Sequence, residues 1–336
     1  MLNRRTLLKS AIAFAALSLA APAAAQSDGP IPVVATFSIL GDMVERIGGA
    51  QVVVTTLVGP NGDAHVYRPT PAAARAVSEA EILVVNGLEF EGWLDRLIEA
   101  SDFRGLRVVA TDRIEPIAFE DDHDQEAHAA EEGHDHGHDH GHDHGHEGHG
   151  KTGAHDHHDH GAFDPHAWQS LANAVIYVDN ITAALAKADP ENAGTFYRNR
   201  AAYVAEIEAL DAEIRAIVGA LPQDRRTIVT SHDAFQYFGR DYGLAFLSPQ
   251  GISTESEASA RDVARLIERI RNEGISAVFL ENIADSRLLE RIAEETGATI
   301  GGTLYPGALS GPEGPAPSYL DMMRHNATTL ARALSS

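Results

Sequence analysis

The 336-residue sequence contains no cysteine. It can therefore form no disulfide framework and offers no cysteine for lipid attachment. The sequence also lacks a long apolar run. None of its apolar runs reaches the roughly 20 residues that are needed to span a bilayer. We expect a soluble, non-lipidated protein whose folding does not depend on the redox state of its compartment.

Basic side chains are few. Lysine and arginine total 26 against 49 aspartates and glutamates, which gives a formal net charge of -23. This charge excludes nucleic acid as a partner, because the protein would repel a phosphate backbone. Acidity suits a protein that meets cations, although a merely soluble acidic surface explains most of it.

The N-terminus has the pattern of an export signal. The pair Arg4–Arg5 and Lys9 precede an apolar run from Ala11 to Ala21, and a small-residue cleavage pattern ends at Ala25. We expect residues 1–25 to be removed and the mature protein to reside in the periplasm. The paired arginines resemble a twin-arginine signal, and the ordinary secretory route remains open.

Short β-rich segments alternate with amphipathic helical segments in both halves of the sequence. The expected strands are Pro32–Phe37, Val52–Val58, Glu81–Asn86, Arg107–Thr111, Arg226–Ser231, Leu244–Pro249, Ile275–Asn282 and Ala298–Tyr305. Between the two sets, the sequence from Ala167 to about Gly219 is helical, with a break at Ala188–Asn192 where Asp189 and Pro190 predict a new helix start. The alternation predicts an α/β protein with two lobes of parallel sheet and helices, joined by a long helix.

We therefore divide the sequence into five parts. They are the export signal 1–25, an N-terminal α/β lobe 26–119, a His/Asp-rich segment 120–160, the end of the N-terminal lobe with the long connecting helix 161–225, and a C-terminal α/β lobe 226–336.

The segment 120–160 holds 14 of the 18 histidines together with 13 carboxylates. It cannot bury enough apolar surface to fold, and we expect a disordered loop. Its repeat "HDHGHDHGHDHGHEGH" offers many alternative pairs of imidazoles, which suits rapid capture of zinc with little selectivity. We expect weak auxiliary zinc binding by the histidines of this repeat, namely His134, His136, His138, His140, His142, His144, His146 and His149.

Four histidines lie outside this segment. His65, His166 and His232 each lie at the end of an expected strand or just before a helix, whereas His325 lies inside the C-terminal helix, where we expect a packed or solvated role. Ligands of parallel sheets gather outside the carboxyl ends of the strands. The first three histidines could therefore converge from both lobes.

Five motifs point to a known family. "GDAHVYRPTP", "DPHAW", "SHDAFQYF", "FLENIAD" and "GPAPSYLDMM" resemble, in this order, the metal-specific solute-binding proteins of bacterial ABC importers, and in particular the zinc-selective branch with a histidine-rich loop. The resemblance implies two α/β lobes bridged by a long rigid helix, with one buried metal ion between them. It implies His65, His166 and His232 as ligands, Zn²⁺ as the transported ion and a membrane permease as partner. A periplasmic zinc chaperone that loads the site would be a second partner. We expect a monomer.

The third ligand and the missing fourth one bear on the choice of metal. Manganese-selective relatives usually have a carboxylate where this chain has His232, and imidazole suits zinc better, which leaves manganese as the alternative metal. Relatives commonly supply an aspartate in a stretch resembling "LYSDALSG", but here "LYPGALSG" places Gly307 at that position. Water, Asp63, Glu281 or a histidine of the segment 120–160 could fill the fourth position.

Two other functions compete with transport. Three histidines with an open fourth position also describe a catalytic zinc, so a zinc-dependent hydrolase or lyase is one alternative. The sequence has no "HExxH" motif and no glutamate placed as a general base, and we expect no enzyme. The other alternative is a periplasmic metal buffer or zinc chaperone in which the histidine-rich segment is the main binding element.

Overall fold

The computed structural model describes residues 29–118 and 163–335. The expected export signal and the His/Asp-rich segment 120–160 lie outside the described residues.

The first lobe is built on a parallel sheet with the strand order β2-β1-β3-β4. Its strands are β1 (Ile31–Phe37), β2 (Val52–Val58), β3 (Ile82–Val85) and β4 (Leu106–Val109). Helices α1 (Ser38–Gly48), α2 (Pro71–Glu79) and α3 (Leu94–Ser101) connect them. Every residue of β3 is buried, as expected for the apolar run of a strand that is covered on both faces.

The second lobe repeats this plan with the strand order β6-β5-β7-β8, again all parallel. Its strands are β5 (Thr227–Val229), β6 (Ala245–Leu247), β7 (Ala277–Glu281) and β8 (Thr299–Leu304). The helices of this lobe are α6 (Gln236–Tyr242), α7 (Ala260–Glu273), α8 (Arg287–Thr296) and α9 (Tyr319–Leu334). The two parallel sheets confirm the predicted α/β fold with two lobes.

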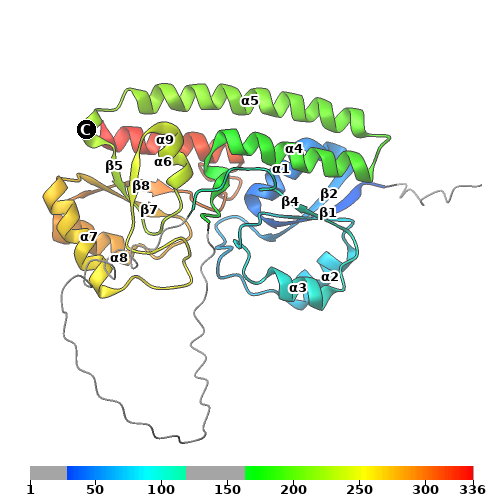
Figure 1. Cartoon of the computed structure of the whole chain (residues 1–336), viewed down its shortest axis with the longest axis horizontal. Coiled ribbons are helices and arrows are strands. Elements are labelled where there is room, and N and C mark those ends of the chain that lie inside the picture. The colour runs from blue at the N-terminus through cyan, green and yellow to red at the C-terminus, as the bar shows by residue number, and fades with distance from the viewer. Residues whose placement is uncertain (1–28, 119–162, 336) are drawn as a thin grey trace, which may run out of the picture.

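Two helices connect the lobes. Helix α4 (Leu171–Ala188) packs along α5 (Ala193–Gly219), and α5 also contacts α1 of the first lobe and α9 of the second. Figure 1 shows α5 extending over the top of both lobes. At 1.5 Å per residue its 27 residues span about 40 Å. Its buried residues recur every three or four positions from Val204 to Val218, which keeps one apolar face on the rest of the protein.

One expected boundary differs from the structure. The sequence predicted that the second of these helices starts at Asp189 and Pro190, but α5 begins at Ala193. The Asp189 carboxylate accepts hydrogen bonds from the backbone and side-chain nitrogens of Asn192. It therefore stabilises the turn that precedes the helix, as an aspartate does in a tight turn.

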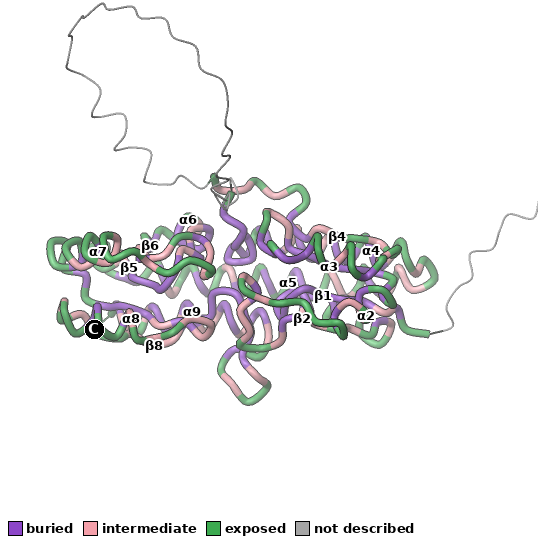
Figure 2. Tube along the Cα trace, turned by 90° about the horizontal axis from the view of Figure 1, so that it is seen from below, coloured by how far each residue is buried: buried purple, intermediate pink, exposed green. Residues whose placement is uncertain are grey.

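A single apolar core extends through both lobes. It joins buried residues of β1 and α1 to the helices α4, α5 and α9, and continues to Ile228, Phe279 and Leu304 in the second sheet. A smaller core, around Leu266 and Ile292, lies under α7 and α8. Figure 2 shows buried stretches in both lobes and exposed stretches at their periphery. Within residues 29–118 and 163–335, no helix combines the length and apolarity of a membrane span.

We predict that binding of the divalent metal ion expected from the sequence leaves the two lobes in nearly the same relative position. The shared core and α5 oppose hinge bending, so that metal binding and release should move loops only. X-ray scattering of the metal-free and metal-loaded forms should give the same radius of gyration. A variant lacking residues 123–160 removes any contribution of that segment, and a clear change of radius in that variant would contradict the prediction.

Candidate metal site

Three histidines from both lobes meet in one cluster. His65 lies on the loop between β2 and α2, His166 directly precedes the short helix Ala167–Gln169, and His232 follows β5. One ring nitrogen of each histidine lies within 4.8 Å of those of the other two. The structure thus brings together the three histidines that the sequence singled out.

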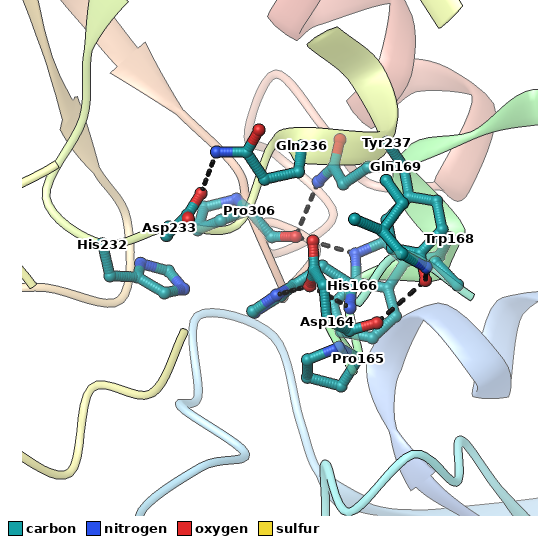
Figure 3. A network of polar contacts seen from close by, with 12 residues as sticks. Asp164, Pro165, His166, Trp168, Gln169, His232, Asp233, Gln236, Tyr237 and Pro306 are labelled. Carbon is teal, nitrogen blue, oxygen red and sulfur yellow. Dashed lines mark hydrogen bonds and ion pairs between the residues drawn. The ribbon is translucent and has the colours of Figure 1, made fainter. Parts of the chain in front are cut away.

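The spacing of the nitrogens suits a single metal ion. Nε2 of His65 and Nε2 of His166 are 3.2 Å apart. Two nitrogens at 2.0–2.1 Å from one tetrahedral ion lie about 3.3–3.4 Å from each other. His232 belongs to the second lobe (Figure 3). Its ring centroid is 5.6 Å from that of His65 and 5.3 Å from that of His166.

Asp164 orients His166. Asp164 Oδ1 accepts a hydrogen bond from the backbone nitrogen of His166 at 2.9 Å and also lies 2.8 Å from its Nδ1. The neutral imidazole therefore has its proton on Nδ1, and the lone pair on Nε2 is free for a metal ion. Tyr237 donates a hydrogen bond to the Asp164 carbonyl and fixes this turn to the second lobe (Figure 3).

Glu281, at the end of β7, does the same for His232. Its Oε2 lies 2.6 Å from His232 Nδ1, and its Oε1 accepts hydrogen bonds from the backbone nitrogens of Ser231 and His232. Nε2 of His232 is buried and has no hydrogen-bond partner among the described residues. A buried nitrogen without a partner is costly, and a metal ion would satisfy it.

The electrostatics favour neutral imidazoles at two of the three positions. Burial lowers the pKa of His65 and of His166 well below the usual value, and the neighbouring histidines lower it further. Burial also disfavours the charged form of His232, but the Glu281 carboxylate outweighs this effect and raises its pKa. A metal ion binds the unprotonated ring, so His65 and His166 are ready to coordinate at pH 7, and His232 is the most basic of the three rings.

Aromatic rings cover one side of the cluster. Phe90 lies edge-on to His65 with 4.7 Å between centroids, and Trp168 lies 5.2 Å from His166. Phe37 contacts both Phe90 and Trp168. These rings exclude water and lower the local polarity, which strengthens the bond between a cation and its ligands.

The fourth position is not filled by a described carboxylate. Neither Asp63 nor Glu281 belongs to the group of ligand atoms within 4.8 Å. Asp63 accepts hydrogen bonds from the His65 backbone nitrogen and from Thr254, while Glu281 contacts His232. Gly307 lies beside Trp168, where an added Cβ would be 3.6 Å from the ring and would meet no steric clash. Pro306 accepts hydrogen bonds from the Trp168 and Gln169 side chains, which anchors this loop (Figure 3).

Sequence reasoning missed several residues that shape the site. One of them is Asp164. It stands two residues before His166, as Asp63 stands two residues before His65. That repeated spacing is a sequence signal that could have revealed it. Phe90 and Thr254 gave no local signal, because they approach the cluster only through the fold. His325 is packed against Tyr305 with its Nε2 at 3.0 Å from the Thr303 carbonyl, as the sequence predicted for a histidine outside the site.

Two α/β lobes that hold three imidazoles between them, two buried and one half-buried, define a two-lobed metal-binding protein. The chain matches the family described as zinc-uptake complex component A, periplasmic, over residues 33–333, and it belongs to this family.

Relatives cover nearly the whole chain but are named for different metals. Iron-binding protein YfeA of Yersinia pestis is 31% identical over 89% of this chain and 85% of its own length. Manganese-binding lipoprotein MntA of Bacillus subtilis is 31% identical over 97% of this chain and 98% of its own length.

Solved structures show the same fold. The manganese-bound periplasmic metal binding protein of Candidatus Liberibacter asiaticus is 29% identical with a TM-score of 0.72, covering 90% of this chain and 98% of that one. The periplasmic zinc binding protein TroA of Treponema pallidum is 27% identical with a TM-score of 0.76, covering 91% and 99%.

Family membership settles the class of function. The protein is an extracytoplasmic substrate-binding protein of an ABC importer, which binds a metal ion as cargo and delivers it to a membrane permease. It is not an enzyme, which removes the hydrolase and lyase alternative. The names of the relatives leave the identity of the metal to be argued from the site.

We predict that Glu281→Gln weakens metal binding about 10- to 100-fold, the usual effect of losing a carboxylate behind a histidine ligand. The amide has no charge with which to support the His232 ring as it binds a cation. Competition with a chelator measures the affinity. Glu290→Gln, at an exposed glutamate of α8, is the matched control and should bind like the unchanged protein. Equal affinity of the two variants would show that Glu281 does not act through His232.

Proposed function

We propose that this protein is a high-affinity zinc receptor that captures Zn²⁺ outside the cytoplasm for an ABC permease. The observation that supports zinc is the chemistry of the cluster, which offers three imidazole nitrogens and, among the described residues, no carboxylate oxygen. Imidazole suits zinc, whereas manganese prefers oxygen ligands. We propose His65, His166 and His232 as the ligands and water as the fourth.

Manganese is the competing cargo, because several relatives are named for manganese or iron. Gly307 argues against it. In the register of the family motif, this position would supply the anionic oxygen ligand, and glycine has no side chain to do so. We also propose that the mature protein carries no lipid, although relatives are lipoproteins, because the sequence has no cysteine for attachment.

The histidine-rich segment 120–160 is proposed to collect zinc for the buried site. Ala118 and Phe163, which flank the residues outside the described part of the chain, form an antiparallel bridge beside the turn that carries Asp164 and His166. Zinc bound there is held at a high local concentration near the cluster. A periplasmic chaperone that loads either element is compatible with this proposal.

We predict that zinc displaces manganese completely when the two ions are present at equal free concentration at pH 7. Competition titration followed by metal analysis of the protein measures the outcome. Comparable affinities for the two ions would overturn the assignment of zinc.

The variant Gly307→Asp tests the reason for this selectivity. The added carboxylate should raise the affinity for manganese more than that for zinc, because it supplies the oxygen ligand that manganese prefers. Gly311→Asp adds the same charge near the same loop, at a position where a side chain meets nothing within 4 Å, and should leave the preference unchanged.

We predict that deletion of residues 123–160 removes the weak zinc equivalents, slows uptake when zinc is scarce, and leaves one tight equivalent. Ligands on the folded lobes are already positioned for one metal ion. The histidine pairs of the segment must instead lose conformational entropy at each binding event, so each pair binds weakly. In the full chain, lowering the pH to about 5.5 should release the weak equivalents first, because ordinary histidines protonate near pH 6.5 and a pair of ligands competes less well with protons than three positioned ones.

His166→Ala is the reciprocal variant. It should abolish tight binding and preserve the weak equivalents, because it removes a positioned ligand and does not touch the segment. Loss of tight binding on deletion of residues 123–160 would instead identify a histidine of the segment as the fourth ligand. If the unchanged protein binds zinc only weakly, with no tight equivalent, the result would support the alternative function as a metal buffer.

A further inference from the structure

Two of the three histidines lie in the same kind of turn. In "DAH" and in "DPH" an aspartate stands two residues before the histidine, and its Oδ1 accepts a hydrogen bond from the histidine backbone nitrogen at 2.9 Å in both cases. An aspartate that bonds to the backbone two residues ahead fixes the local chain direction. Each aspartate therefore sets the direction in which its histidine leaves the backbone.

The two turns differ in what else holds the histidine. Asp164 also contacts the ring of His166, and Glu281 contacts the ring of His232. No carboxylate contacts the ring of His65 in the part of the chain that the structure describes. Apart from the edge-on contact with Phe90, the position of His65 therefore depends on its backbone, and hence on the contacts that hold Asp63.

Asp63 is held from the other lobe. Its second oxygen, Oδ2, accepts a hydrogen bond of 2.5 Å from the hydroxyl of Thr254, which lies between β6 and α7 in the second lobe. The carboxylate is largely buried and its pKa is raised by that burial, while the bonds from Thr254 and His65 oppose the rise. A partly buried carboxylate that has two specific donors is fixed more firmly than one that faces water.

Other contacts show that the whole loop before His65 is clamped between the lobes. Asn61 donates its backbone hydrogen bond to the Leu309 carbonyl, and its side-chain oxygen accepts one from Asn282. From the first lobe, Trp93 donates to the Ala64 carbonyl. These contacts hold the loop at Asn61 and Ala64. The Asp63 carboxylate, which bonds to the His65 backbone, is contacted from the second lobe by Thr254.

A cavity lies beside this bond. Asp63 and Thr254 line it together with Ser231, and its volume is about 550 Å³. Once this bond opens, water from the cavity can replace the Thr254 hydroxyl at the carboxylate.

We infer that Thr254 is a positioning residue for the metal site, whose hydroxyl in the second lobe fixes the Asp63 carboxylate and thereby the His65 ligand in the first. The inference rests on the proposed role of His65 as a ligand. It makes the second lobe contribute to the site twice, directly through His232 and indirectly through Thr254. Once the Thr254 bond opens, His65 is the ligand that leaves first, and the metal ion dissociates from that side.

Thr254→Val tests this, because valine keeps the shape and removes the hydroxyl. Zinc is the probe, and the affinity and the dissociation rate are measured by transfer to a chelator. We expect roughly 10-fold weaker binding, arising from faster dissociation, as is typical for loss of a contact behind a ligand. Thr254→Ser restores the hydroxyl and should restore both values.

Ser253→Ala is the matched control, because the Ser253 hydroxyl accepts a hydrogen bond from Glu255 in the same loop and does not contact Asp63. It should bind zinc like the unchanged protein. The double variant Asp63→Ala with Thr254→Val should bind no more weakly than Asp63→Ala alone, since both changes interrupt one path. Unfolding of the metal-free forms shows whether a variant still folds.

Three results would overturn the inference: unchanged zinc dissociation in Thr254→Val, failure of Thr254→Ser to restore it, or an additional loss in the double variant. His65→Ala separates this inference from the proposed function. If His65→Ala weakens zinc binding but Thr254→Val does not, only the positioning role is wrong. If His65→Ala has no effect, the proposed ligand set itself is wrong.

Discussion

The site depends on packing three imidazoles against one another, with His166 and His232 buried and His65 half-buried. Their nitrogens gather within 4.8 Å, and Nε2 of His232 has no hydrogen-bond partner among the described residues. Such an arrangement is unfavourable by itself, because buried polar atoms need partners and because none of these rings can take up a proton without placing a charge near the other two. A cation bound at the centre removes this conflict, since it satisfies all three lone pairs at once. The free energy gained on binding includes the relief of that conflict.

The scaffold keeps the rings in this position. Two carboxylates, Asp164 and Glu281, contact the Nδ1 atoms of His166 and His232, and the elements that carry them belong to different lobes. The relative position of the lobes must therefore be fixed for the site to exist. The core that passes from β1 through α4, α5 and α9 to Phe279 provides this constraint. A single apolar core resists opening more strongly than a flexible linker between separate cores would.

The sequence predicted the fold well because its signals are local. Each expected strand overlaps an observed one, since β-rich runs and the glycines and prolines between them depend on neighbouring residues only. The convergence of the three histidines was predicted because parallel strands place their carboxyl ends at one edge. The contacts that orient the histidines are another matter. Glu281 lies 49 residues from His232, and Thr254 lies 191 residues from Asp63. No sequence pattern specifies such pairs, because the fold alone brings them together.

The unequal support of the three ligands suggests how tight binding and release can coexist in one site. His166 and His232 are fixed through their rings by buried carboxylates, whereas His65 is fixed through its backbone by a loop that spans the lobes. With the proposed ligand set, tight binding requires all three histidines, but release requires the loss of only one. Because the lobes share a core, we expect release to occur without wide opening. A partner that breaks the bond between Asp63 and Thr254, which lies beside a cavity, would then release the proposed ligand His65 first. The same rigidity that creates the site thus restricts its opening to the least supported ligand.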